Sequence, residues 1–344
     1  MTLSIERADR RMGLASDRTV YSSKRNRPLL LYGRLLDDSR RSHGLTATNP
    51  DYFLFADNTA ATRYSPSRSA IPVVMIREYR DRTAVITGAA SGLGRALARE
   101  LTIRKCNVAL IDIDSSGLEK VKEELAQLGA VVTGHCVDIG SEQALQRVAA
   151  EIGSAHGTVH LVINNAAVSA SASFANTSAA EFERIIRVNF FGVVYGCRAF
   201  LPFLQKQAGG QILNVASCFA WLGYPGKTAY ASSKGALRCF SESLRLELAN
   251  SGVGVTLLYP GPLHTSLVRN GISDSEQRRK CEEQFLMSRG LPLERVVRRC
   301  LDELLTNPSR IVIGLDYRLL DALTRLSPRL AGRAMEFVAA RVGF

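Results

Sequence analysis

Residues 87–94 read Thr-Gly-Ala-Ala-Ser-Gly-Leu-Gly, between a β-branched run at Thr83–Thr87 and a helix-length amphipathic pattern at 93–104. Glycines in such a loop permit a tight turn and let the backbone approach a pyrophosphate, which the positive end of the helix attracts. A plain strand-to-helix turn is the simpler interpretation. The position after the first predicted strand favours a dinucleotide site. The expected cofactor contacts in this loop are Gly88, Ser91, Gly92, Leu93 and Gly94.

Short apolar runs alternate with helix-length amphipathic patterns from residue 82 onward. This alternation is typical of a parallel sheet covered by helices on both faces. We therefore predict an α/β fold, a doubly wound parallel sheet of the Rossmann type with about seven strands, whose ligands bind beyond the carboxyl ends of the strands. The predicted strands are 83–87, 107–113, 131–137, 159–163, 211–215, 255–259 and 310–313. The predicted helices are 93–104, 118–128, 142–152, 179–205 and 230–250.

The composition divides the chain into three parts. Residues 1–76 lack periodicity and are rich in Arg, Ser, Thr, Asn and Asp, so we expect a basic, mostly disordered N-terminal extension. An alternative is that Met75 is the natural start and that an over-long gene model supplies the residues before it. Residues 77–315 form the predicted α/β domain. Residues 316–344 are predicted to form a basic amphipathic helical tail, with apolar residues at helical spacing.

The formal net charge of +12 is concentrated at the two ends of the chain. Residues 1–74 hold 12 Lys and Arg against 7 Asp and Glu, and residues 289–344 hold 10 Arg against 6 acids. Because no basic stripe interleaved with aromatic residues occurs between them, we expect no nucleic-acid partner. For the tail, packing against the domain or a partner subunit is the favoured interpretation, and weak peripheral contact with an anionic membrane is the alternative.

The predicted compartment rests on two features that the sequence lacks. No apolar run approaches the roughly 18 residues of a membrane span. The 7 cysteines are scattered and include no Cys-x-x-Cys pair, which favours reduced thiols. We therefore expect a cytoplasmic protein, with peripheral membrane association as the alternative.

Asp112 ends the second predicted strand and favours NAD over NADP as the cofactor. A carboxylate at this distance after a glycine loop accepts hydrogen bonds from the adenosine ribose and repels a 2′-phosphate. Asp114 is a rival for this role, although it would lie past the strand end. Asp138 and Ile139 are candidate adenine contacts, and the simpler interpretation of Asp138 is a cap ahead of Ser141.

Tyr230 and Lys234 begin a long helical pattern, so both side chains lie on one helix face. A free phenol has a pKa near 10, and a nearby ammonium group would lower it toward the range of a useful base. Such a pair is common on helix surfaces and is weak evidence alone. Ser217 ends the buried run 212–217. Its hydroxyl can point toward the same cleft, although the residue could equally be a strand-end cap.

Together these motifs resemble those of the short-chain dehydrogenase/reductase family over residues 82–314, and they occur in the family's order. The glycine loop, Asn164-Asn165-Ala166-Ala167 and Pro260-Gly261-Pro262-Leu263-His264-Thr265 match cofactor-binding motifs of the family. Ala167 is a departure, since glycine is usual there. The resemblance implies a catalytic tetrad of Asn189, Ser217, Tyr230 and Lys234. It also adds Asn165, Ala166, Pro260, Gly261 and Thr265, together with Tyr230 and Lys234, to the cofactor contacts.

By this resemblance, residues 77–315 would be an NAD-binding oxidoreductase domain that transfers a hydride between NAD(H) and an alcohol or ketone. Tyr230 would exchange the proton, Lys234 would bind the nicotinamide ribose, Ser217 would polarise the reacting oxygen and Asn189 would hold a relay water. We expect a medium or large apolar substrate (a steroid, retinoid or lipid-derived carbonyl compound), a homodimer or homotetramer, and no catalytic metal. Two alternatives are a non-catalytic NAD-binding sensor or scaffold protein and a sugar-nucleotide epimerase. The epimerase is disfavoured by the glycine spacing.

Overall fold

The computed structural model describes residues 76–342 apart from 208, 266 and 270. The predicted N-terminal extension and the question of a start at Met75 therefore lie outside the described residues.

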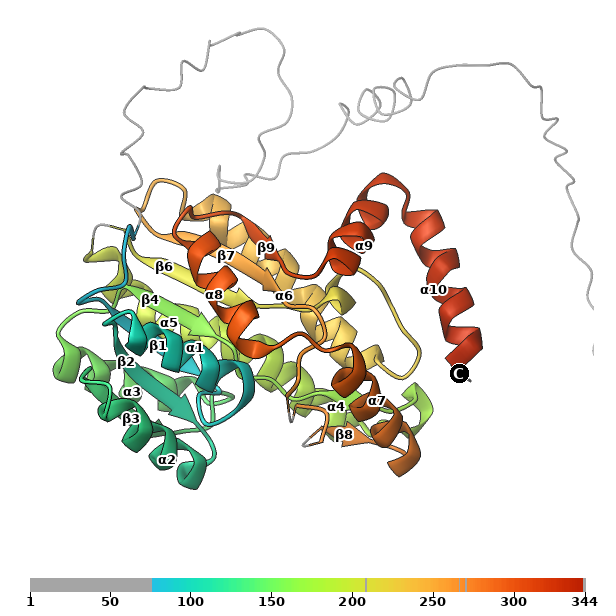
Figure 1. Cartoon of the computed structure of the whole chain (residues 1–344), viewed down its shortest axis with the longest axis horizontal. Helices are drawn as coiled ribbons and strands as arrows, with labels where there is room; N and C mark the ends of the chain where they lie inside the picture. The colour runs from blue at the N-terminus through green and yellow to red at the C-terminus, as the bar shows by residue number, and fades with distance from the viewer. Residues whose placement is uncertain (1–75, 208, 266, 270, 343–344) are drawn as a thin grey trace, which may run out of the picture. The chain divides into compact units, whose positions relative to one another are not determined.

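A seven-stranded parallel sheet forms the centre of the described domain, with strand order β3-β2-β1-β4-β6-β7-β9 (Figure 1). The chain runs outward from β1 through β2 to β3 and then returns to β4 on the other side of β1. This reversal places a topological switch point between β1 and β4, where open α/β sheets bind their ligands. The predicted fold class is confirmed. The strands are β1 (Thr83–Thr87), β2 (Asn107–Asp112), β3 (Val132–Cys136), β4 (Leu161–Asn164), β6 (Gln211–Val215), β7 (Gly254–Tyr259) and β9 (Arg310–Val312).

Helices cover both faces of the sheet, each over its own apolar core. Leu97 and Leu301 lie fully buried in the core of one face, and Ile152 and Phe200 lie fully buried in that of the other. The first core includes residues of α1 (Gly92–Ile103), α2 (Ser115–Ala126) and α8 (Leu293–Leu304). The second includes residues of α3 (Glu142–His156), α5 (Gly192–Gln205) and α6 (Thr228–Glu247).

The helix predicted over 179–205 is interrupted in the structure. It consists of α4 (Ala179–Ile186), a π-helical turn at Arg187–Phe191, and α5. A capping box between Ser178 and Glu181 starts α4, which explains its sharp beginning. By length and mean hydropathy this segment is the one described helix that could cross a membrane. It contributes Ile185 and Phe200 to the buried cores, as expected of a core helix in an α/β domain.

Two short strands outside the main sheet were not predicted. β5 (Ala170–Ser171) pairs in parallel with β8 (Ile272–Ser273). Two residues are too few to show an alternating pattern, so the sequence carries no signal for them. The pair joins the chain after β4 to the chain before α7 (Glu276–Arg289), and thereby sets where α7 begins.

The C-terminal residues form two helices, α9 (Leu315–Leu326) and α10 (Pro328–Val342), which contact each other. Arg310 of β9 donates a hydrogen bond of 2.8 Å to Asp321, whose carboxylate is buried, and so ties α9 to the edge of the sheet.

Candidate active site

The glycine loop after β1 is shaped by close packing of backbone against backbone. Gly88 and Gly92 have φ angles of +67° and +52°, which L side chains rarely adopt. A Cβ atom at Gly94 would overlap the carbonyl oxygen of Gly88. Each of these three positions therefore requires glycine, and the loop leaves the start of α1 open toward the cleft.

Asn165 and Thr87 fasten this loop to the end of β4. The Asn165 Nδ2 atom donates to the carbonyl oxygens of Thr87, at 2.9 Å, and Gly88, at 3.2 Å. The Thr87 hydroxyl oxygen accepts from the backbone N–H groups of Asn165 and Ala166, at 3.0 and 3.1 Å. Ala167, the departure from the family pattern, follows directly and has no positive φ. An alanine therefore fits this backbone without strain.

Asp112 lies at the carboxyl end of β2 with its carboxylate held against the glycine loop. Its Oδ2 atom accepts from the backbone N–H of Ala90 at 2.8 Å, and its Oδ1 atom accepts from those of Ile113, at 2.8 Å, and Asp114, at 3.1 Å. Asp114 instead caps α2 by accepting from the backbone N–H of Gly117 at 3.0 Å. Both carboxylates line the cleft, but only that of Asp112 is held against the glycine loop.

Ser217, Tyr230 and Lys234 meet at the next strand end along the sheet. Ser217 follows β6 and lies beside Tyr230, which is in the first turn of α6, so that its hydroxyl acts on the pKa of the phenol. Lys234, one turn later, lies with its Nζ atom 5.8 Å from the centre of the Tyr230 ring and donates to the carbonyl oxygen of Val215 at 2.8 Å. The buried phenol of Tyr230, the buried amine of Lys234 and the partly exposed hydroxyl of Ser217 therefore face one cleft.

The pKa values of this cluster differ from the expectation drawn from the sequence. Burial raises the pKa of Tyr230, and the hydrogen bond with Ser217 opposes the rise only in part. Burial also lowers the pKa of Lys234 to about 8. The pKa of Tyr230 is therefore raised overall, whereas a lowering by Lys234 was expected, because desolvation of the phenol is the largest effect.

Asn189 is the tetrad residue whose side chain does not reach the cleft. It is fully buried in the π-helical turn, where its Oδ1 atom accepts from the backbone N–H of Val168 at 2.8 Å. Its Nδ2 atom donates to the Val168 carbonyl oxygen, at 2.9 Å, and to the Ser233 hydroxyl, at 3.1 Å. The side chain therefore positions Val168, a wall residue of the cleft. A water-holding role would require the Asn189 main chain and stays a prediction.

One cleft of about 1180 Å³ collects nearly all the site residues expected from the sequence. Gly94, packed beneath Gly88, and Asn189 are the two that do not line it. Asp138 lines it and also accepts from the backbone N–H of Gly140 at 2.8 Å, while Ser141 caps α3. The expected residues that line the cleft are Gly88, Ser91, Gly92, Leu93, Asp112, Asp138, Ile139, Asn165, Ala166, Ser217, Tyr230, Lys234, Pro260, Gly261 and Thr265.

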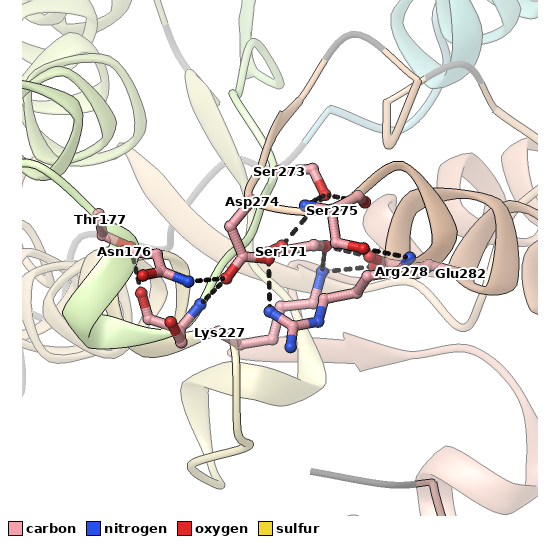
Figure 2. A network of polar contacts seen from close by, with 10 residues as sticks. Ser171, Asn176, Thr177, Lys227, Ser273, Asp274, Ser275, Arg278 and Glu282 are labelled. Atoms are coloured by element: carbon pink, nitrogen blue, oxygen red, sulfur yellow. Dashed lines mark hydrogen bonds and ion pairs between the residues drawn. The ribbon is translucent and has the colours of Figure 1, made fainter.

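The other end of the cleft contains an ion pair that the sequence did not reveal. Lys227, three residues before Tyr230 and largely buried, forms an ion pair with Glu282 of α7. Its Nζ atom also donates to the Ser171 hydroxyl at 2.6 Å, and Ser171 contacts Glu282 in turn. Figure 2 shows the three side chains converging, from the N-cap of α6, from β5 and from α7. The partners are 55 residues apart in sequence, so no local pattern could have indicated the pair.

A second set of contacts in Figure 2 holds the start of α7. The Asp274 carboxylate accepts from the backbone N–H of Ser173 at 2.8 Å and from Asn176 Nδ2 at 3.1 Å, and it pairs with Arg278 at 2.6 Å. No side chain of α7 is fully buried. Polar contacts, more than apolar packing, therefore hold α7 over the cleft.

Comparison with known proteins identifies the family. Residues 82–276 match the family model described as short chain dehydrogenase. The chain belongs to the short-chain dehydrogenase/reductase family. SadH of Mycobacterium tuberculosis, which is described as an oxidoreductase, is 36% identical over 254 residues, covering 72% of this chain and 91% of SadH. Dehydrogenase/reductase SDR family member 7B of Bos taurus is 33% identical over 205 residues, covering 58% of this chain and 63% of that protein.

Solved structures of the family share the fold. A short-chain dehydrogenase/reductase from Burkholderia phymatum in complex with NAD has a TM-score of 0.67 and 28% identity, covering 73% of this chain and 94% of its own. An alcohol dehydrogenase from Thermococcus sibiricus complexed with 5-hydroxy-NADP has a TM-score of 0.59 and 26% identity, covering 67% and 95%. Both of these structures hold a nicotinamide cofactor. Among the described residues, no group of three or more His, Cys, Asp or Glu could hold a metal ion.

Proposed function

We propose that this oxidoreductase transfers a hydride between NAD(H) and an alcohol or ketone, with Tyr230 as the general acid and base. The observation that carries the proposal is the cluster of Ser217, Tyr230 and Lys234 in the same cleft as the glycine loop. A non-catalytic NAD-binding protein would have no need of a buried lysine, whose desolvation costs stability. Hydroxyl and amine groups in this arrangement can move a proton.

The residues have separable roles in this proposal. A bound nicotinamide supplies the hydride or accepts it. In the oxidation, Tyr230 takes the proton of the substrate hydroxyl, and in the reduction it gives that proton back. Ser217 donates a hydrogen bond to the reacting oxygen, and Lys234 offers its charge to the ribose of the cofactor and to the developing phenolate.

Asp112 supports NAD over NADP. Its carboxylate is held at the cradle by three backbone N–H groups, so it cannot swing away from a 2′-phosphate. Arg95, the nearest cation after the loop, pairs instead with Glu124 at 2.6 Å on the exposed side of α1. A phosphate on the ribose would therefore meet a fixed negative charge with no cation in the loop to offset it.

An apolar substrate is supported by the walls of the cleft beyond Tyr230. Phe219 lies edge-on to the Tyr230 ring, at 6.1 Å between centroids, and the walls include side chains of α7, α9 and α10. The apolar ones are Phe285, Leu286, Leu320 and Met335, and Leu267 and Val268 of the loop before β8 join them. These residues favour a medium or large apolar alcohol or ketone, such as a steroid, a retinoid or a lipid-derived carbonyl compound.

A homodimer or homotetramer and a cytoplasmic location stay predictions.

A substrate panel tests the proposal. The protein is mixed with short, long-chain and polycyclic alcohols plus NAD or NADP, and with the matching ketones plus NADH or NADPH, while the nicotinamide absorbance is followed. We expect turnover with NAD(H), faster for the larger apolar compounds. Tight NADH binding without turnover of any compound would instead support a cofactor sensor.

A further inference from the structure

The outer face of α9 carries an exposed apolar stripe. Leu315, Leu319 and Leu326 are 75%, 64% and 86% exposed, and with Ala322 they recur at the spacing that places residues on one helix face. The tail was expected to pack against the domain or a partner subunit. Leu319 and Leu326 do not pack against the described domain, which leaves a continuous apolar surface on α9.

α10 repeats the arrangement. Leu330 and Phe337 are 55% and 57% exposed, and Ala334 lies between them on the same helix face. Exposed leucines at regular spacing on α9, continued by Leu330 on α10, form an apolar surface of the kind that marks an interaction site. We call these seven residues the apolar stripe of α9 and α10.

Arginines border this stripe. Arg318 follows Leu315 by three positions, as Arg333 follows Leu330, so each lies beside the apolar residues on its helix. Arg329 and Arg333 are exposed, and no ion pair with an acid is found for either within residues 76–342. An apolar face bordered by cations is typical of a helix that lies in the surface of an anionic bilayer.

The inner faces of the same two helices line the mouth of the cleft. Tyr317 and Leu320 of α9 and Met335 of α10 contribute to its walls, as does Phe285 of α7, which is 53% exposed. A surface that contacted a bilayer through the apolar stripe would therefore hold the entrance of the substrate pocket close to the lipid.

We propose that the apolar stripe of α9 and α10 docks on an anionic lipid bilayer, from which the apolar substrate enters the cleft. The entry of the substrate from the bilayer rests on the proposed function, whereas the docking does not. Pairing of two copies through this surface is the alternative, and sedimentation separates it from docking on a bilayer. Phospholipid headgroups offer the negative charge that Arg329 and Arg333 lack among the described residues.

Flotation of the full chain with vesicles tests the docking. The vesicles contain either phosphatidylcholine alone or phosphatidylcholine with phosphatidylserine. The test variants are Leu319→Gln/Leu326→Gln and Arg329→Gln/Arg333→Gln, and the control is Leu246→Gln, at a leucine of α6 that is 78% exposed and outside the stripe. We expect binding to the anionic vesicles, a loss of about fivefold or more in each test variant, and no change in the control.

Two further measurements separate the outcomes. Oxidation of a water-soluble alcohol should be unchanged in all variants, so a lack of turnover counts against the proposed function and leaves the docking result standing. Equal flotation of wild type and test variants would overturn the docking. It would also be overturned if sedimentation showed wild-type dimers, monomeric leucine variants and no vesicle binding, since the stripe would then join two copies of the chain.

Discussion

The two ends of the cleft are held in place by different kinds of interaction. At the cofactor end, glycines, buried strand ends and backbone hydrogen bonds restrict which residue types fit, as Gly94 beneath Gly88 illustrates. At the substrate end, α7 has no fully buried side chain and is held by polar contacts, while α9 exposes Leu315, Leu319 and Leu326. The comparison teaches that one end is fixed by shape and the other by adjustable contacts, which suits a constant cofactor and a variable substrate.

The largest effect should come from breaking the shape of the cofactor end. We expect Gly94→Ala to weaken NADH binding by about a hundredfold or more, since a steric conflict of about 3 kcal/mol has that consequence. The new methyl group would displace the Gly88 carbonyl group and open the loop. Fluorescence titration with NADH measures the loss. Gly235→Ala, where an added Cβ meets nothing within 4 Å, is the control and should bind normally.

The next effect concerns the buried charge of Lys234. Its folded-state pKa of about 8 lies below the unfolded value of about 10.4, so the unfolded chain holds the proton more tightly between these values. Stability should therefore rise as the pH increases from about 8 toward 10. We expect Lys234→Met to stabilise the cofactor-free protein by about 2 kcal/mol at neutral pH and to remove this rise. Urea unfolding at neutral and alkaline pH measures both, and a less stable variant would contradict the account.

These two ends also differ in how far the sequence could predict them. The strand order, the cradle and the cluster at Ser217, Tyr230 and Lys234 follow from local patterns, since each motif lies at a strand end that the sheet brings together. The pair of Lys227 with Glu282 depends on where α7 comes to rest, which no local pattern encodes. The raised pKa of Tyr230 was not expected from the sequence for a related reason, because burial is a property of the assembled domain.

A moderate effect should follow from removing the fixed charge at the cradle. We expect Asp112→Ser to raise the preference for NADP relative to NAD by about tenfold, which corresponds to about 1.4 kcal/mol. Ratios of kcat/KM for the two cofactors measure it. Asp114→Ser removes a neighbouring acid that caps α2, and it should lower stability without altering the preference. If only Asp114→Ser changed the preference, the role of Asp112 would be disproved.

The smallest effect is expected at the substrate end. Lys227→Met leaves Glu282 partly buried without its partner, so α7 should be held less well and KM for a large alcohol should rise about fivefold, with kcat changed less. The double variant Lys227→Met/Glu282→Leu should recover part of the loss, because two apolar side chains can pack where the ion pair was. Glu283→Gln, which loses only the 3.8 Å pair with exposed Arg269, is the control. A KM that is unchanged in Lys227→Met would show that the pair does not hold α7.

The central claim is that Tyr230 carries the proton at a hydride-transfer site. Tyr230→Phe removes one oxygen atom and keeps the ring that packs against Phe219. Turnover of the best alcohol from the panel and the Kd for NADH are measured on the same preparations of wild type and variant. We predict that turnover falls by about a thousandfold or more, as expected when a general acid or base is lost, while the Kd changes less than about threefold. Turnover within about tenfold of wild type, with the same NADH affinity, would contradict the assignment of Tyr230.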